Sequence, residues 1–300
     1  MPRGLFRIRD ADGARRLAAG DVLDGPDSVV ADDLDLDSVL AGGGPTLEEA
    51  IAAATEPIDG DVHVEAPVES QEIWAAGVTY RRSRDARIEE AVEPSPYDRV
   101  YEAERPELFL KAPGWRAVGP DGAIGIRADS DWDVPEPELA LVIDASLAIV
   151  GYTIGDDVSS RTIEGENTLY LPQAKTYERS CSLGPAIVPA SAIEPPFPIR
   201  MTIERDGTIV YDERTGTDAM ARPFEDLVGY LGRALAFPVG VMLLTGTGIV
   251  PDPPFTLQPD DIVRIEVGGL GALVNPVVRV GVDRASSDRQ LGLRIEQEDA

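Results

Sequence analysis

The chain has 300 residues, of which 43% are hydrophobic, so it is long enough to bury a large core in one or two domains. Its 54 acidic and 27 basic residues give a formal net charge of −27, which repels phosphate backbones and argues against nucleic acid as a partner. Two of the basic residues are lysines and 25 are arginines, and this acid-rich, lysine-poor composition is typical of halophilic archaea, whose molar salt screens the repulsion.

The N-terminal residues 1–9 lack the apolar region of a secretory signal, and no stretch approaches the roughly 18 apolar residues that span a bilayer. Cys181 is the single cysteine, which excludes an intrachain disulfide. We therefore expect a cytoplasmic protein that does not contact membranes.

The first part of the chain predicts a short hairpin and a helix. Residues 5–18 alternate and contain a turn at Asp12-Gly13, as in a β-hairpin. The stretch 20–45 is rich in Asp and Gly and is expected to be a loop. Thr46 is expected to begin a helix, because Glu49 three residues later completes a capping box.

Three parts follow from these patterns. Residues 57–67 read as a linker, so we place a small N-terminal α/β domain before it and a catalytic domain after it. The polar residues after Val282 are expected to form a mobile tail. The predicted boundaries are 1–65 for the small domain, 66–283 for the catalytic domain and 284–300 for the tail.

Strands dominate the catalytic region. Apolar runs of strand length occur at residues 73–78, 108–110, 139–143, 148–154, 241–244 and 262–267. Residues 201–211 predict a hairpin with Asp206-Gly207 at its tip, 83–91 have helical character, and 223–236 form an amphipathic pattern. With 25 prolines and 29 glycines for tight turns, the predicted fold class is mostly β with a few helices, α+β.

Several kinds of chemistry are excluded by missing residues. His63 is the only histidine and falls in the expected linker, which argues against His-dependent hydrolases and His-ligated zinc. Without a histidine base, Cys181 reads as a small buried residue rather than a nucleophile. No phosphate-binding glycine motif is present. The remaining carboxylates, hydroxyls and two lysines favour an oxygen-ligated cation such as Mg²⁺ or Mn²⁺.

The strongest candidate ligands are Glu136 and Glu138. On a strand these two residues face the same way, so both carboxylates can converge on one ion. Spacing alone is weak support, because chance gives roughly ten such acid pairs in so acidic a chain. Their position is more informative: they stand directly before the apolar run 139–143, where two like charges are costly without a cation.

A third carboxylate is available in the next strand. Residues 148–154 run into Gly155-Asp156-Asp157 and then into serines and Arg161. One acid from this segment would complete three protein ligands and leave coordination sites for water and substrate.

Five ordered motifs now stand in one region. They are Glu136-x-Glu138-Leu139-Ala140, Asp157-Val158-Ser159-Ser160-Arg161, Lys175-Thr176-Tyr177, Gly184-Pro185 and Thr245-Gly246-Thr247. Over roughly residues 72–280 the chain thereby resembles the fumarylacetoacetate hydrolase superfamily. This resemblance implies a mixed β-roll catalytic domain behind a small N-terminal domain, and a homodimer or homotetramer.

Within that superfamily, the chain is most similar to the 2-keto-3-deoxy-D-arabinonate (pentonate) dehydratases. The shared stretches are Arg105-Pro106-Glu107-Leu108-Phe109-Leu110-Lys111-Ala112, Asp129-Ser130-Asp131-Trp132 and Glu166-Asn167-Thr168-Leu169-Tyr170-Leu171-Pro172-Gln173-Ala174-Lys175. The resemblance implies that the Mg²⁺ ligands are Glu136, Glu138 and Asp157. It also implies that Lys175 contacts the metal-bound substrate and that Thr247 lies at the substrate carboxylate.

Two positions depart from the superfamily pattern. Ser83 stands where the C–C hydrolases commonly carry a histidine that helps to activate water, which favours the dehydratase branch. Thr162 follows Arg161 where an aspartate is more usual, so a salt-bridging or hydrogen-bonding acid is lost there.

The expected reaction starts from a 2-keto acid that chelates Mg²⁺, which stabilises the enolate formed by removal of a C3 proton. Loss of the C4 hydroxyl then leads to 2,5-dioxopentanoate. We expect Lys175 and Glu107 to be the acid and base, in an order left open, with the pKa of Lys175 lowered by burial beside a cation. The alternative role for Glu107, equally weighted, is a salt bridge with a nearby arginine. Gln173, Tyr80 and Lys111 complete the expected substrate-binding residues, together with Thr247.

Three rival functions remain. An acylpyruvate-type C–C hydrolase and an oxaloacetate-type decarboxylase would each use the same metal site. A catalytically silent metal-binding or scaffold protein would need its acids only for solvation in salt. Lys175 beside Gln173 and Glu107 near Lys111 weigh against the scaffold, which has no use for them.

Overall fold

The computed structural model describes residues 2–30, 34–82 and 97–282. Its strands are β1 (Arg3–Arg9), β2 (Arg15–Asp21), β3 (Gly25–Val30), β4 (Ala54–Pro57), β5 (His63–Glu65), β6 (Glu72–Gly77), β7 (Glu107–Pro113), β8 (Ile124–Arg127), β9 (Asp133–Val134), β10 (Pro137–Ile143), β11 (Ile149–Asp157), β12 (Ser159–Ser160), β13 (Cys181–Pro189), β14 (Pro198–Arg205), β15 (Thr208–Gly216), β16 (Val241–Leu244), β17 (Ile262–Val267) and β18 (Gly271–Val280). Its α-helices are α1 (Leu36–Leu40), α2 (Leu47–Ala53), α4 (Tyr97–Glu102), α5 (Arg161–Glu166), α6 (Leu171–Lys175) and α7 (Phe224–Leu231), and its 3-10 helices are η1 (Gly114–Arg116), η2 (Thr168–Tyr170) and η3 (Thr217–Ala219). The mostly β fold class is confirmed.

The N-terminal hairpin and the capped helix are both confirmed. Strands β1 and β2 pair in antiparallel fashion. Helix α2 has the complete capping box: Glu49 N–H donates to the Thr46 hydroxyl at 3.2 Å, and Thr46 N–H donates to the Glu49 carboxylate at 2.9 Å. Such a box satisfies backbone donors that the first helical turn otherwise leaves unpaired.

The predicted loop at 20–45 is wrong, because it contains strand β3 and helix α1. The valines at the end of β3 are buried, and Asp35 caps α1 by accepting a hydrogen bond from Ser38 N–H at 2.8 Å. One aspartate of this Asp-rich segment therefore serves as the N-cap of a helix.

The predicted linker at 57–67 is also wrong in its middle. Residues 63–65 form β5, which pairs with β1. The buried Glu65 carboxylate is held by three arginines of β1 and β2, namely Arg7, Arg9 and Arg15.

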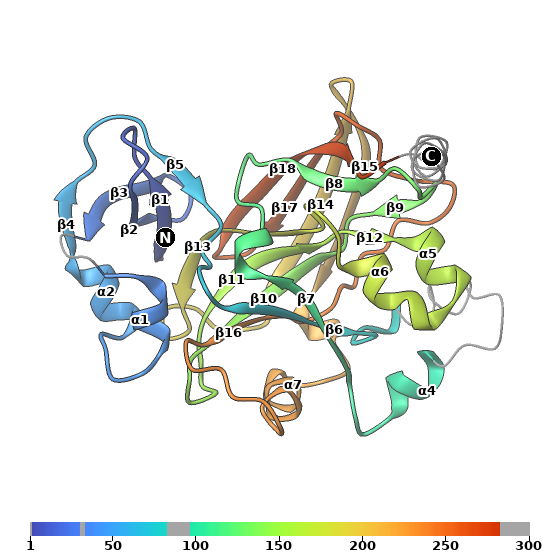
Figure 1. Cartoon of the computed structure of the whole chain (residues 1–300), viewed down its shortest axis with the longest axis horizontal. Coiled ribbons are helices and arrows are strands. Elements are labelled where there is room, and N and C mark those ends of the chain that lie inside the picture. Colours follow the sequence, from blue (N-terminus) through green and yellow to red (C-terminus); the bar gives the residue numbers. More distant parts are fainter. Residues whose placement is uncertain (1, 31–33, 83–96, 283–300) are drawn as a thin grey trace, which may run out of the picture.

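One long sheet joins the N-terminal strands to the rest of the chain. Its order is β4-β3-β2-β1-β13-β11-β10-β16-β6-β7, with β5 beside β1. The junction is the antiparallel β1–β13 pairing, where Leu5 lies opposite Ile187. In Figure 1 the strands β1–β5 and the helices α1 and α2 gather at the left, apart from the larger β structure. The domain boundary near residue 65 stays a prediction.

A second sheet packs against the central strands of the first. Its order is β15-β14-β17-β18-β8. Residues of β10 and residues of β14 and β17 belong to one buried hydrophobic cluster, which includes Leu141, Met201 and Ile265. The predicted hairpin at 201–211 is the β14–β15 pair, and the positive φ angles of Asp206 and Gly207 make its tight turn.

The helix predicted at 223–236 is shorter than expected. Helix α7 ends at Leu231, before Gly232, and Leu235 lies outside it with 43% of its surface exposed. Over the described ranges, no helix has both the length and the apolar character needed to cross a membrane. The predicted helix at 83–91 and the predicted tail at 284–300 lie outside the described residues.

Candidate metal centre and active site

Two neighbouring strands bring the three candidate ligands together. Strands β10 and β11 are antiparallel, with Glu138 opposite Gly155 and Asp157 N–H donating to the Glu136 carbonyl at 3.0 Å. Because side chains alternate along a strand, Glu136, Glu138 and Asp157 share one face. One ligand atom from each carboxylate lies within 4.8 Å of the others.

The neighbouring acid, Asp156, takes the opposite face. It lies opposite Pro137 in the ladder, and its carboxylate accepts a hydrogen bond from Glu136 N–H at 2.9 Å. Burial raises the pKa of Asp156 to about 7. The strand register thus separates Asp157 from Asp156, which the sequence alone did not.

The three ligand candidates are buried and electrostatically strained. Each side chain belongs to a residue with at most 3% of its surface exposed. Burial, followed by the charges of Asp157 and Glu136, raises the pKa of Glu138 well above its ordinary value. The Glu138 carboxylate also accepts the Gly246 N–H at 2.6 Å. A cluster of this kind favours the approach of positive charge.

Within the part of the chain that the structure describes, cationic side chains contact these carboxylates. Lys175 Nζ lies 2.9 Å from Glu136 Oε2 and 2.9 Å from Asp157 Oδ2, and it donates to Ser159 Oγ at 2.6 Å. Arg161 Nη1 lies 3.2 Å from Glu136 Oε1. Lys111 Nζ lies 2.5 Å from Asp157 Oδ1.

The donor set fits Mg²⁺ or Mn²⁺. All three candidate ligands are hard carboxylate oxygens, converging from two adjacent strands into a buried site. No imidazole or thiolate competes among the three, so the set does not resemble a zinc site.

A small cavity opens directly over this cluster. Glu107 and Thr247, both predicted as site residues, line it together with the three carboxylates and Lys175. The Thr247 hydroxyl also closes a local loop, since it accepts from Ile249 N–H and donates to the Ile249 carbonyl, each at 3.1 Å. The sequence-predicted acid–base pair and Thr247 therefore reach the same cavity.

Three other predicted site residues lie differently. Gln173 is exposed on α6, and its backbone carbonyl accepts from Arg127 Nη1 at 3.1 Å. Tyr80 is buried and forms a β-bridge with Met220, and burial raises the pKa of its phenol. Lys111 is buried behind Asp157 rather than at the cavity surface. Their roles as substrate ligands remain predictions.

Sequence reasoning missed several residues of the cavity. Glu164, Phe109 and Leu171 all line it, and Glu164 is buried although it is charged. A signal for Glu164 was present: it lies in the short helix α5, which begins at Arg161 of the motif and is capped by Ser160.

The structure explains the unusual threonine at position 162. Its hydroxyl accepts hydrogen bonds from the backbone N–H groups of Trp132 at 3.0 Å and Asp131 at 3.3 Å. The acceptor function expected of an aspartate is therefore kept by Thr162. Ser83, the other departure, lies outside the described residues.

Cys181 and His63 both lie outside the lining of the cavity over the carboxylates. Cys181 is buried and reduced, and burial raises the pKa of its thiol to about 12, which makes it a poor nucleophile. His63 is exposed on β5 and does not line the cavity over the carboxylates.

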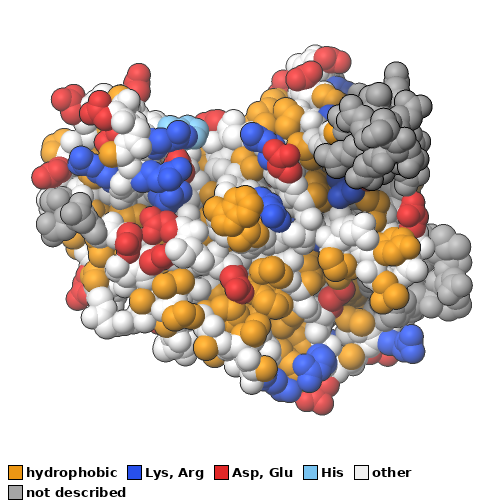
Figure 2. Space-filling model, in the orientation of Figure 1, with side chains coloured by type: hydrophobic (Ala, Val, Ile, Leu, Met, Phe, Trp, Pro, Cys, Tyr) orange, Lys and Arg blue, Asp and Glu red, His pale blue; other side chains and the backbone are white. Residues whose placement is uncertain are grey.

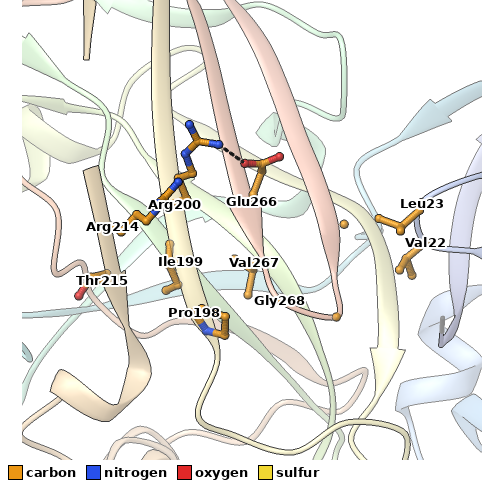
Figure 3. Close-up of a pocket in the computed structure, with 12 residues that line it drawn as sticks. Val22, Leu23, Pro198, Ile199, Arg200, Arg214, Thr215, Glu266, Val267 and Gly268 are labelled. Carbon is orange, nitrogen blue, oxygen red and sulfur yellow. Dashed lines mark hydrogen bonds and ion pairs between the residues drawn. The ribbon is translucent and has the colours of Figure 1, made fainter. Parts of the chain in front are cut away.

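A larger hollow, of about 430 Å³, lies away from the carboxylates. In Figure 3, Val22 and Leu23 stand across it from Ile199 and Val267, and its marked polar contact joins Arg200 to Glu266 at 3.4 Å. This mostly apolar lining provides no acid–base group beside a metal cluster. The cavity over Glu138 is therefore the better candidate for the active site.

Comparison with known proteins gives consistent results. The family profile described as fumarylacetoacetate (FAA) hydrolase C-terminal matches residues 72–278. A Haloferax volcanii protein named "Probable 2-keto-3-deoxyxylonate dehydratase" is 48% identical over 82% of this chain and 88% of its own length. A Saccharolobus solfataricus protein named "2-dehydro-3-deoxy-D-arabinonate dehydratase" is 41% identical over 72% of this chain and 75% of its own.

A solved structure supports the same relationship. It is described as 2-keto-3-deoxy-D-arabinonate dehydratase complexed with magnesium and 2,5-dioxopentanoate. It superposes with a TM-score of 0.80 at 34% identity, covering 93% of this chain and 100% of that chain.

Proposed function

The chain belongs to the fumarylacetoacetate hydrolase family, and we propose that it is a Mg²⁺-dependent hydro-lyase that converts a 2-keto-3-deoxypentonate into 2,5-dioxopentanoate. The relatives named as dehydratases support this reaction at 48% and 41% identity. The observation that carries it is the buried cluster of Glu136, Glu138 and Asp157 with Lys175 between two of its members.

In this proposal, the three carboxylates hold Mg²⁺ or Mn²⁺. When bound, the metal supplies Lewis-acid stabilisation of negative charge on the oxygens of a 2-keto acid. Elimination of water needs a group that removes a proton from C3 and a group that protonates the departing C4 hydroxyl. The resulting 5-hydroxy-3-ene must then lose a proton from C5 and gain one at C3, and the enol so formed becomes the C5 aldehyde by protonation at C4.

Lys175 is well placed for one of these proton transfers. Its Nζ is fixed by Glu136, Asp157 and the Ser159 hydroxyl at the floor of the cavity, so it approaches a substrate held over the same carboxylates. From this position its amino group can transfer a proton to or from an atom of that substrate.

Glu107 is the proposed partner of Lys175. It begins β7 opposite Gly77, the last residue of β6, and its carboxylate lies across that glycine into the cavity. Because residue 77 is a glycine, the Glu107 carboxylate can occupy the space where a Cβ would otherwise lie. We leave open which of the two groups is the acid and which is the base.

The substrate is a small 2-keto acid, and Thr247 at the cavity wall is proposed to bind its carboxylate. We propose that the enzyme works in the cytoplasm as a homodimer or homotetramer.

One assay separates the dehydratase from its rivals. The protein is incubated with Mg²⁺ in molar salt and a 2-keto-3-deoxypentonate of arabinonate or xylonate type, and the products are identified by mass spectrometry. Loss of one water with formation of 2,5-dioxopentanoate is expected. Release of pyruvate instead would show C–C hydrolysis or cleavage, and loss of CO₂ from oxaloacetate with no reaction of the pentonate would show a decarboxylase.

A further inference from the structure

The two lysines of this chain meet at one carboxylate. Lys175 Nζ lies 2.9 Å from Asp157 Oδ2 on the cavity side, while Lys111 Nζ lies 2.5 Å from Asp157 Oδ1 on the inner side. In a sequence with 25 arginines, both of its lysines thus contact a single aspartate.

Lys111 is a fully engaged internal cation. None of its surface is exposed, and besides Asp157 its ammonium donates to the carbonyls of Val158, at 3.0 Å, and Lys175. An ammonium has three N–H donors, so these three partners use them all. The side chain therefore holds one Asp157 oxygen and leaves the other facing the cluster, without a donor left for substrate.

The positive charge of Lys111 lies beside the carboxylates of the candidate metal site. The carboxylates Glu136, Glu138 and Asp157 carry three formal negative charges. Lys111, Lys175 and Arg161 contact these carboxylates, and the Glu107 and Glu164 carboxylates line the same cavity. The buried positive charge of Lys111 offsets part of this negative charge, and beside a bound divalent metal it would favour a substrate carboxylate and the negative charge that develops during enolisation.

We propose that Lys111 is a positioning residue whose fixed internal charge weakens metal binding and in return keeps the metal-loaded site electropositive for an anionic substrate. The inference rests on the function proposed above. It predicts that a neutral residue at position 111 strengthens metal binding and weakens substrate binding. A merely structural role predicts the reverse for the metal, because a poorly oriented ligand typically costs about 10- to 100-fold in affinity.

The variants Lys111→Gln and Lys111→Arg separate charge from hydrogen bonding. Glutamine keeps two N–H donors without the charge, and arginine keeps the charge. We expect Mn²⁺, titrated without substrate and followed by electron paramagnetic resonance of the free ion, to bind Lys111→Gln roughly tenfold more tightly than wild type. The KM for the 2-keto acid is expected to rise by roughly tenfold, and Lys111→Arg is expected to restore both constants toward wild type.

A matched control removes a cation from another buried carboxylate. Arg205 lies 2.7 Å from the fully buried Asp261 in the five-stranded sheet, so Arg205→Gln should lower the melting temperature and leave the Mn²⁺ affinity unchanged. Lys111→Met serves as a second neutral variant if the glutamine variant does not fold. Unchanged or weaker Mn²⁺ binding in the folded neutral variant overturns the role of Lys111. Absence of Mn²⁺ binding in the wild type overturns the metal site itself, and with it both proposals.

Discussion

Among single residues, Glu138 is a ligand candidate whose negative charge is costly without a metal. Its pKa is raised well above the ordinary value by burial and by two neighbouring carboxylates. We expect Glu138→Gln to reduce turnover by at least about 100-fold, because a neutral amide is a weak ligand for Mg²⁺. The fold should survive, since the amide oxygen can still accept the Gly246 N–H and one of three crowded charges is removed.

Metal titration and circular dichroism test this prediction together. The variant should show a native spectrum, an unchanged or higher melting temperature without metal, and strongly weakened Mn²⁺ binding. Retention of near-normal turnover would remove Glu138 from the metal site.

A second residue, Asp133, should make stability depend on pH. It is buried on β9, and burial raises its pKa from 3.8 to about 6. A carboxyl group whose pKa is raised on folding favours the folded state at low pH, and this contribution is lost as the pH rises through the folded pKa. Between about pH 4 and pH 6 the wild type should therefore lose up to about 3 kcal/mol relative to a non-titrating residue.

Asp133→Asn isolates that contribution. The free energy of unfolding of the variant minus that of the wild type should be small at pH 4 and grow in favour of the variant up to pH 7. Taking the difference cancels the groups that titrate in both proteins. Denaturant unfolding in molar salt provides the measurement, and a difference that does not vary between these pH values contradicts the prediction.

The candidate ligands could be located from the sequence for a physical reason, whereas the directions of other side chains could not. Glu136 and Glu138 stood at the head of an apolar run, where strand alternation fixes which side chains share a face. The inward direction of Lys111 and the exposure of Gln173 depend on how β7 and α6 pack in three dimensions. Local pattern does not encode that packing, so these residues were assigned to substrate on resemblance alone.

At the scale of elements, the β6–β7 pair positions Glu107. Gly77 lies opposite Glu107 in this antiparallel ladder, and a Cβ at position 77 would overlap the Glu107 carboxylate. Gly77→Ala should therefore displace Glu107 and lower kcat by roughly 10- to 100-fold. Its Mn²⁺ affinity should stay close to wild type, because Glu107 is not among the three candidate ligands.

Gly229→Ala provides the matched control. Gly229 lies exposed in helix α7, and a Cβ there meets no neighbouring atom. This substitution should leave kcat unchanged and raise stability by about 0.5–1 kcal/mol, as expected for alanine in place of glycine in a helix. Equal kcat values for the two variants and the wild type would show that the position of Glu107 does not matter.

Elements were predictable where a local signal was strong. The capping box of Thr46 and Glu49 gave the start of α2, and Asp206-Gly207 gave the turn of the β14–β15 hairpin. Strand β5 was read as linker because three residues are too short for a periodic pattern, and only their pairing with β1 makes them a strand. Long-range pairing of this kind is decided by tertiary contacts that the local sequence does not show.

At the scale of the whole molecule, charge is distributed unevenly between surface and interior. Figure 2 shows Asp and Glu side chains at many separate places around the visible face, with an apolar area toward its lower centre. The buried carboxylates of the site face cations, whereas the formal net charge of −27 reflects an excess of acids over the entire sequence. Mutual repulsion among surface acids destabilises the compact state unless ions screen it.

If salt screens the repulsion among the surface acids, the stability of the protein should depend on salt concentration. The Debye length falls from about 10 Å at 0.1 M salt to about 3 Å at 1 M, so most of the repulsion should disappear within this range. We expect the melting temperature to rise steeply in KCl up to about 1 M and only slowly above it. The same osmolality of sucrose should have a much smaller effect, because sucrose is excluded from protein surfaces without screening charge. A melting temperature that is equal at 0.1 M and 1 M KCl, or that rises as much in sucrose, would show that surface charge does not limit the stability of this protein.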